Sequence, residues 1–155
     1  SRVGQVCHKV LELWDFKKAG ELRLSVDQAC RQLGRVDPRA DWNSVSAEAH
    51  EILKPFMNSP IARELGAVEI VGREIPFSYD EDGAVMRGSI DLVYRDKGRI
   101  VVVDYKSGRM NAKDLPALRE KYRRQGKAYC AAIEKSLGVA SASFRLIFLR
   151  APGLS

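Results

Sequence analysis

Apolar and polar side chains alternate through two neighbouring runs of the chain, residues 85–94 and 99–106. The four residues between them, 95–98, include an aspartate and a glycine, which favour turns. Because side chains of a strand alternate between two faces, this period restricts the segment to a β-hairpin with one buried face. The predicted apolar face consists of Ile90, Leu92, Tyr94, Val101, Val103 and Tyr105.

The opposite face of this hairpin carries two carboxylates and a lysine. A four-residue loop would pair Tyr94 with Arg99, and Asp91, Asp104 and Lys106 would then share one face. Charged residues on the open face of a hairpin are usually solvated. Valines lie on this face too, so the carboxylates are expected to be covered, and a covered carboxylate is costly unless it is paired or bound to a metal ion. The pattern therefore favours a metal site.

Five segments of the chain resemble motifs of a known family, and they occur in that family's order. They are residues 4–8 (Gly-Gln-Val-Cys-His), 74–77 (Glu-Ile-Pro-Phe), 88–91 (Gly-Ser-Ile-Asp), 104–107 (Asp-Tyr-Lys-Ser) and 125–129 (Gln-Gly-Lys-Ala-Tyr). The family is the PD-(D/E)xK nuclease superfamily, specifically the RecB-type nuclease domain of UvrD-like helicases such as RecB and AddA. The resemblance spans most of the chain.

This resemblance implies a fold and a set of site residues. The expected fold is α/β, with a restriction-endonuclease-like core in which helices flank a mixed β-sheet, and with a helical N-terminal half. The family's pattern implies that Asp91 and Asp104 hold Mg²⁺ or Mn²⁺, that His8 and the carbonyl of Tyr105 are further ligands, and that Lys106 assists the attacking water. Imidazole suits Mn²⁺ better than Mg²⁺, which prefers oxygen ligands.

Three further residues allow two interpretations each. Gln125 and Tyr129 are neighbours on one helix face, where Tyr129 is either a core aromatic or, as the resemblance implies, part of the catalytic surroundings. Gln125 is correspondingly either a buried amide bonded to backbone or a residue that orders the site. Glu74 is either a structural strand acid or a carboxylate close to the metal ligands, and the resemblance favours the second.

Basic residues are concentrated after the proposed catalytic lysine, and the net charge of +6 favours a polyanionic partner. A charge run is usually a solvated helix face, but its position here favours contacts to DNA phosphates. The predicted DNA-binding residues are Arg109, Lys113, Arg119, Arg123, Arg124 and Lys127. Such contacts bind DNA largely independently of its sequence.

The remaining periodicities predict the other elements of an α/β fold. Helices are expected at residues 3–18, 21–33, 44–57, 58–65 and 114–137, and strands at 67–79, in one or two pieces, and at 143–149. A turn is expected at 80–83. The three cysteines are scattered, which argues against a disulfide framework and against a zinc or iron–sulfur site.

The chain of 155 residues has the length of one domain and contains no apolar run long enough to span a membrane. Its first residues do not have the basic-then-apolar pattern of a signal peptide. It lacks a phosphate loop for ATP, and it begins close to the first motif without an initiator methionine. We therefore expect residues 1–155 to be a single nuclease domain excised from a longer bacterial, cytoplasmic helicase–nuclease, whose helicase portion is a partner.

The sequence thus predicts a metal-dependent deoxyribonuclease, expected to be an exonuclease in double-strand-break repair or recombination. An alternative is a catalytically silent DNA-binding module with the same fold. A different metal phosphohydrolase is disfavoured, since the chain has no His-x-His or Asp-x-His cluster.

Overall fold

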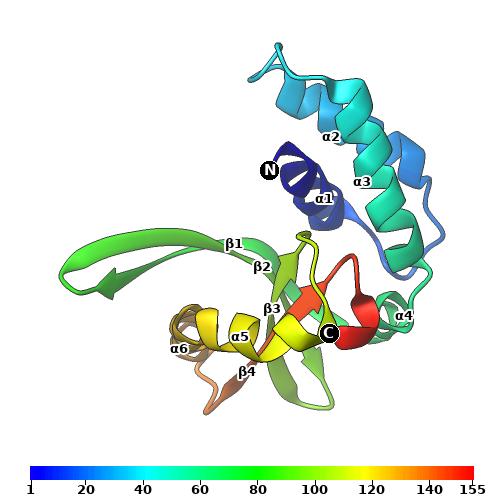
Figure 1. Cartoon of the computed structure of the whole chain (residues 1–155). Coiled ribbons are helices and arrows are strands. Elements are labelled where there is room, and N and C mark those ends of the chain that lie inside the picture. Colours follow the sequence, from blue (N-terminus) through cyan, green and yellow to red (C-terminus); the bar gives the residue numbers. More distant parts are fainter.

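The computed structural model describes all 155 residues, and it places a helical N-terminal half against a four-stranded sheet (Figure 1). The first half consists of α1 (Arg2–Leu13), α2 (Leu22–Gly34), α3 (Trp42–Met57) and α4 (Pro60–Ala67). The second half consists of β1 (Glu69–Glu81), β2 (Ala84–Asp96), β3 (Arg99–Lys106), η1 (Ala112–Asp114), α5 (Leu115–Lys121), α6 (Arg123–Leu137), β4 (Ala142–Phe148) and η2 (Pro152–Leu154). The predicted α/β class with a helical N-terminal half is confirmed.

The sheet is mixed, as expected. Its strand order is β1-β2-β3-β4, with antiparallel pairs at β1/β2 and β2/β3 and a parallel pair at β3/β4. A parallel pair needs a crossover connection, and α5 with α6 provides it. The β1–β2 hairpin extends well beyond the rest of the sheet (Figure 1). No helix reaches both the length and the apolar character that a membrane-spanning segment requires.

The turn between β2 and β3 is tighter than predicted. Asp96 pairs with Arg99, so the predicted pairing of Tyr94 with Arg99 is wrong. The loop consists of Lys97 and Gly98, with φ of 50° and 80°, which matches the positive φ of both central residues in a two-residue type I′ turn. The register slips by two residues relative to the prediction, and an even slip keeps every side chain on its face.

Both faces of the sheet are covered, which explains why the hairpin buries its acidic face as well. The helices α1–α4 cover one face, where Leu92, Tyr94, Val103 and Tyr105 join the larger apolar cluster. Helix α6 covers the other face with a smaller cluster of Ile90, Val93, Ile100, Val102, Tyr129 and Ile133. Ile90 was expected beside Leu92 and instead packs in the smaller cluster. Regular alternation is therefore interrupted between these two residues, at Asp91.

The predicted helix 114–137 is wrong as a single element. The structure divides it into η1, α5 and α6, and Tyr122 joins the two α-helices with a φ of −95° and a ψ of 3°. The apolar repeat that predicted one helix runs through both pieces and so hides the break. The third helix also differs from its prediction: it begins at Trp42, with Asp41 accepting the Ser44 N–H as N-cap.

Gly126 allows α6 to lie directly on β4, and this contact carries a stability prediction. A Cβ at this position would overlap the Phe144 ring. We expect Gly126→Ala to lower the free energy of unfolding by about 1–3 kcal/mol, although alanine raises helix propensity by about 1 kcal/mol. Urea denaturation would measure the change. Gly108→Ala is the control, because a Cβ at Gly108 meets nothing within 4 Å. A Gly126→Ala variant as stable as the parent would contradict this packing.

Candidate active site

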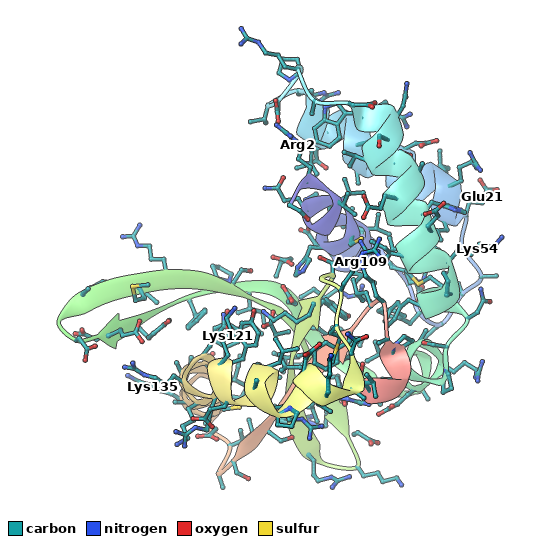
Figure 2. All side chains as sticks on the ribbon, viewed as in Figure 1. Arg2, Glu21, Lys54, Arg109, Lys121 and Lys135 are labelled. Atoms are coloured by element: carbon teal, nitrogen blue, oxygen red, sulfur yellow. The ribbon has the colours of Figure 1, made fainter.

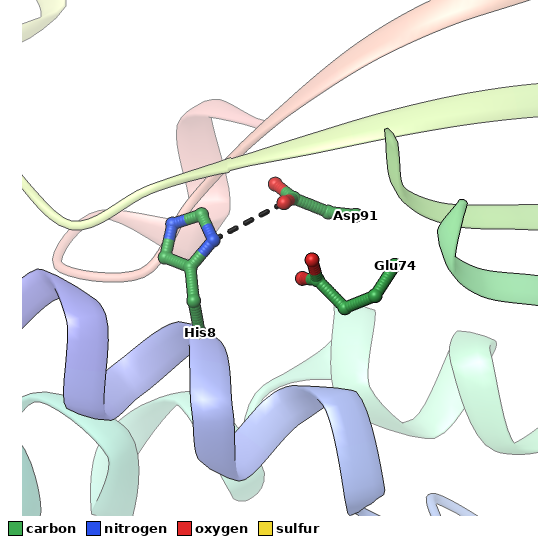
Figure 3. Close-up of side chains that lie close together, drawn as sticks. All are labelled: His8, Glu74 and Asp91. Carbon is green, nitrogen blue, oxygen red and sulfur yellow. Dashed lines mark hydrogen bonds and ion pairs between the residues drawn. The ribbon is translucent and has the colours of Figure 1, made fainter. Parts of the chain in front are cut away.

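Three side chains from three separate elements converge beside the sheet (Figure 3). His8 comes from α1, Glu74 from β1 and Asp91 from β2, and one ligand atom from each lies within 4.8 Å of the others. His8 Nδ1 is 3.1 Å from Asp91 Oδ1. One imidazole and two carboxylates at this spacing form a donor set for a divalent cation.

Asp91 is fixed from two sides. One oxygen contacts His8, and the other, Oδ2, accepts the Tyr105 N–H at 2.7 Å. The β2–β3 ladder ends at the Leu92–Val103 pair, so this bond holds β3 where the ladder stops. Asp91 is 8% exposed. The predicted ligand role of the Tyr105 carbonyl stays a prediction, since the contact made by Tyr105 at the site is through its N–H.

Asp104 and Lys106 follow each other on one face of β3, as predicted. Lys106 Nζ lies 2.7 Å from Asp104 Oδ2, an ion pair that only partly compensates the burial of this oxygen. Burial raises the pKa of Asp104 from 3.8 to about 6, Lys106 opposes the increase, and the charge of Asp91 adds to it. A buried, incompletely satisfied carboxylate oxygen beside Asp91 fits a cation site.

His8 and Glu74 respond to the same cluster of charges. Burial lowers the pKa of His8, but the hydrogen bond and charge of Asp91, together with the charges of Asp104 and Glu74, outweigh it, so the pKa is raised overall. Burial also raises the pKa of Glu74, although Ser89 opposes this by donating a hydrogen bond to Glu74 Oε2 at 2.8 Å. The site therefore concentrates negative charge and retains protons more readily than exposed groups would.

Glu74 reaches the cluster through an unusual backbone conformation. Its φ is 46°, the left-handed region that residues with a Cβ rarely adopt. It lies between the Arg73–Leu92 and Ile75–Ile90 pairs, at the same level of the sheet as Asp91. Strained residues concentrate at functional sites. Of the two interpretations, the geometry favours a carboxylate close to the metal ligands.

Gln125 and Tyr129 contact each other, with Gln125 Nε2 donating to the Tyr129 hydroxyl at 2.6 Å. The Tyr129 ring is buried against Phe77 and Phe144, so it is a core aromatic. Burial, and to a lesser extent the charge of Asp104, raises its pKa to about 12. Gln125 Oε1 is buried without a partner, and the backbone bond considered for this amide is not found.

The predicted DNA-binding residues do not form one continuous face. Arg119, Arg123 and Lys127 line a hollow of about 940 Å³ beside β4, whereas Arg124 lies 3.3 Å from Glu81 of the β1–β2 hairpin. Lys113 belongs to η1 and is exposed. Arg109 lies on the loop after β3 and lines a hollow next to α3 (Figure 2). The break at Tyr122 contributes to this division, because basic residues before and after it belong to two separate helices and do not share one helix face.

A hollow of about 480 Å³ opens beside His8 and Glu74. Its other lining residues are Ser1, Gly4, Gln5, Lys9, Glu12, Leu33 and Ser107. The hollows of 870 and 940 Å³ lie elsewhere, against α2–α4 and against α5–α6. The smaller polar hollow contains two members of the cluster, His8 and Glu74, in its lining.

Sequence reasoning missed two residues that support this cluster. Arg73 Nη1 donates to the carbonyls of Leu11 and Trp14 at the end of α1, which holds the helix of His8 against the sheet. Tyr122 falls inside the predicted helix 114–137 and had no predicted role, yet the centroid of its ring lies 3.7 Å from Lys106 Nζ. No local pattern marks either contact, since both join residues far apart in the sequence.

Comparisons with known proteins identify the family of the chain. The family model described as the PD-(D/E)XK nuclease superfamily matches residues 1–154. Bacterial proteins that are each named as a subunit of an ATP-dependent helicase/nuclease are similar to the chain: that of Staphylococcus epidermidis is 26% identical and covers 88% of this chain, and that of Clostridium acetobutylicum is 27% identical and covers 90%. The relative from Ruminiclostridium cellulolyticum is 25% identical over 97% of the chain.

The chain spans only 12–13% of the length of these relatives. The match to the family model, by contrast, extends over almost the whole chain and includes every residue of the acidic cluster. The mixed sheet flanked by helices is the restriction-endonuclease-like fold expected of that family. The chain belongs to the PD-(D/E)XK nuclease superfamily.

Proposed function

We propose that this chain is a deoxyribonuclease domain that hydrolyses phosphodiester bonds with Mg²⁺ or Mn²⁺. The main support is a pair of buried carboxylates with charged neighbours: Asp91 contacts His8, which lines the polar hollow, and Asp104 is paired with Lys106. Carboxylates are rarely buried unless paired or bound to a metal ion. Membership of a nuclease superfamily gives this arrangement its chemical interpretation.

The residues that would hold the cation are Asp91, Asp104 and His8, with Glu74 or the Tyr105 carbonyl completing the set. Glu74 fits this role because its carboxylate already lies with His8 and Asp91. A divalent cation bound there supplies positive charge that polarises the scissile phosphate and lowers the pKa of water. The donor set of imidazole and carboxylate is better suited to Mn²⁺ than to Mg²⁺.

Lys106 supplies the chain's own positive charge at the reacting atoms. Its ammonium group, half-withdrawn from solvent, would orient the attacking water and stabilise the charge that develops on the phosphate. Asp104 and Lys106 are paired in the structure. On binding, the cation would contact the Asp104 carboxylate, and the substrate phosphate would contact the Lys106 ammonium group. His8 must present an unprotonated ring nitrogen to the cation. Because the pKa of His8 is raised, binding of the cation would have to displace a proton from this ring.

DNA is the proposed substrate because exposed basic residues are concentrated on α5, on α6 and on the segment that joins them to β3. Arg109, Lys113, Arg119, Arg123, Arg124 and Lys127 are the proposed phosphate contacts. Their division between several faces favours a strand that passes over more than one side of α5–α6, with affinity that falls as salt increases.

We also infer the setting of the domain from its relatives. The chain matches a short part of proteins that are named as helicase/nuclease subunits, so we propose that residues 1–155 are the nuclease domain of a longer helicase–nuclease. A cytoplasmic exonuclease acting in double-strand-break repair or recombination would follow from that setting. The helicase portion would deliver the DNA strand.

A cleavage assay tests this proposal. Linear single- and double-stranded DNA, labelled at either end, would be incubated with the chain in Mn²⁺ or in EDTA. We expect cleavage in Mn²⁺ and none in EDTA. The Lys106→Ala substitution should reduce the rate in Mn²⁺ about 10²-fold. Lys135→Ala is the matched control, since Lys135 is an exposed lysine at the far end of α6 (Figure 2). DNA binding without cleavage would identify a silent binding module and contradict the proposal.

A further inference from the structure

Lys106 needs a partner other than Asp104 to stay in place. A lysine side chain has four rotatable bonds, and fixing it costs up to about 2 kcal/mol of conformational entropy. In the structure its side chain is 24% exposed, and Nζ is held by the Asp104 carboxylate at 2.7 Å. If Asp104 turns to a bound cation, as the proposed function requires, that hold on the ammonium group weakens.

The second partner is the face of an aromatic ring. Lys106 Nζ lies 3.7 Å from the centroid of the Tyr122 ring, well inside the ~6 Å within which a cation–π contact is effective. Lys121 Nζ is 5.3 Å from the same ring. Lys106 is therefore the closer of two ammonium groups at this ring, and the one that is partly withdrawn from water.

The break between α5 and α6 accounts for the position of this ring. Tyr122 falls in the apolar repeat of the segment, yet it belongs to neither apolar cluster of the structure. Its backbone leaves the α-helix at φ −95° and ψ 3°, and its ring lies over Lys106. The Tyr122 hydroxyl makes no hydrogen bond to another residue, so the contact is made by the ring face alone.

We propose that Tyr122 is a positioning residue that holds the Lys106 ammonium group at the site, and that it does so when Asp104 is engaged elsewhere. The inference rests on the proposed nuclease function. A cation–π contact restrains the ammonium group without a competing negative charge, so Lys106 keeps its full charge for the substrate phosphate. The property that matters is the electron-rich face of the ring and not its hydroxyl group.

Substitutions at position 122 separate this role from simple packing. We expect Tyr122→Phe to keep kcat within about twofold of the parent, and Tyr122→Leu to lower kcat about 3- to 30-fold with little change in KM. Phenylalanines carrying one, two and three ring fluorines at position 122 should lower kcat progressively, because fluorine depletes the ring face at nearly constant shape. Lys121→Met is the control and should leave kcat unchanged.

A measurement that does not depend on cleavage tests the contact itself. The ε-methylene protons of Lys106 should be shifted upfield by the Tyr122 ring in NMR spectra of the parent and of Tyr122→Phe, and should return to ordinary values in Tyr122→Leu. If the parent does not cleave DNA, the proposed function fails and these shifts still decide the contact. Ordinary Lys106 shifts in the parent, or a Tyr122→Phe variant as slow as Tyr122→Leu, would overturn the inference.

Discussion

Asp91→Asn should reduce metal-dependent cleavage by about 10³-fold, the scale on which removal of one electrostatic contact at a reacting centre acts. Both oxygens of Asp91 are engaged, one with His8 Nδ1 and one with the Tyr105 N–H. Asparagine keeps the shape but removes the negative charge, and its amide would direct N–H groups toward one of these two nitrogen partners. The variant therefore loses the charge of a proposed metal ligand, and it also loses the bond to the Tyr105 N–H if the amide group faces that N–H.

The comparison should be made with Asp96→Asn, which makes the same chemical change on the same strand. Asp96 lies at the far end of β2, paired with Arg99 at the turn. Cleavage rates, Mn²⁺ affinity by calorimetry, and circular dichroism would be measured for both variants. We expect Asp96→Asn to behave like the parent. If Asp91→Asn cuts DNA at the parent's rate, Asp91 has no part in the active site.

Asp104→Asn should show two large effects of opposite sign. Cleavage should fall by about 10³-fold, because the variant removes a ligand charge and the partner of Lys106. The metal-free protein, however, should become more stable at pH 7 by on the order of 2 kcal/mol, because a buried carboxylate no longer has to be ionised there. Such opposition is the ordinary cost of a functional site in a folded protein.

The pH dependence of this gain follows from the direction of the shift. The pKa of Asp104 is about 6 in the folded chain, above the ordinary 3.8. The stability that its protonated form contributes is therefore present below pH 3.8 and is lost as the pH rises through 6. Urea denaturation in EDTA at about pH 4 and about pH 7 would compare variant and parent. We expect Asp104→Asn to be more stable than the parent mainly at the higher pH. A stability gain of equal size at both pH values, or a loss of stability at the higher pH, would contradict the buried position of the Asp104 charge.

Much of the site could be predicted from local sequence because face alternation is insensitive to register. Asp104 and Lys106 share a face whatever the partner strand does, and a register slip of two residues does not by itself move a side chain to the other face. The interruption of alternation at Asp91, which places Ile90 in the smaller cluster, was not predicted. The turn itself was misjudged because Lys97 adopts a positive φ, a conformation that lysine rarely supplies. Glycine or asparagine at that position would have indicated the two-residue loop.

The approach of Glu74 to His8 could not be read from the sequence in the same way. It depends on the positive φ of Glu74 and on how α1 lies across the sheet. No local sequence signal predicts that conformation. The break at Tyr122 is similar, since the apolar repeat of a continuous helix passes through it unchanged.

Anomalous diffraction from crystals soaked in Mn²⁺ would show whether His8, Asp91 and Asp104 surround a divalent cation. We expect one strong peak bonded to His8, Asp91 and Asp104, with Glu74 near it, and no such peak in crystals of Asp91→Asn. Manganese bound only at other places, with the Asp104 carboxylate still paired to Lys106 alone, would contradict the claim.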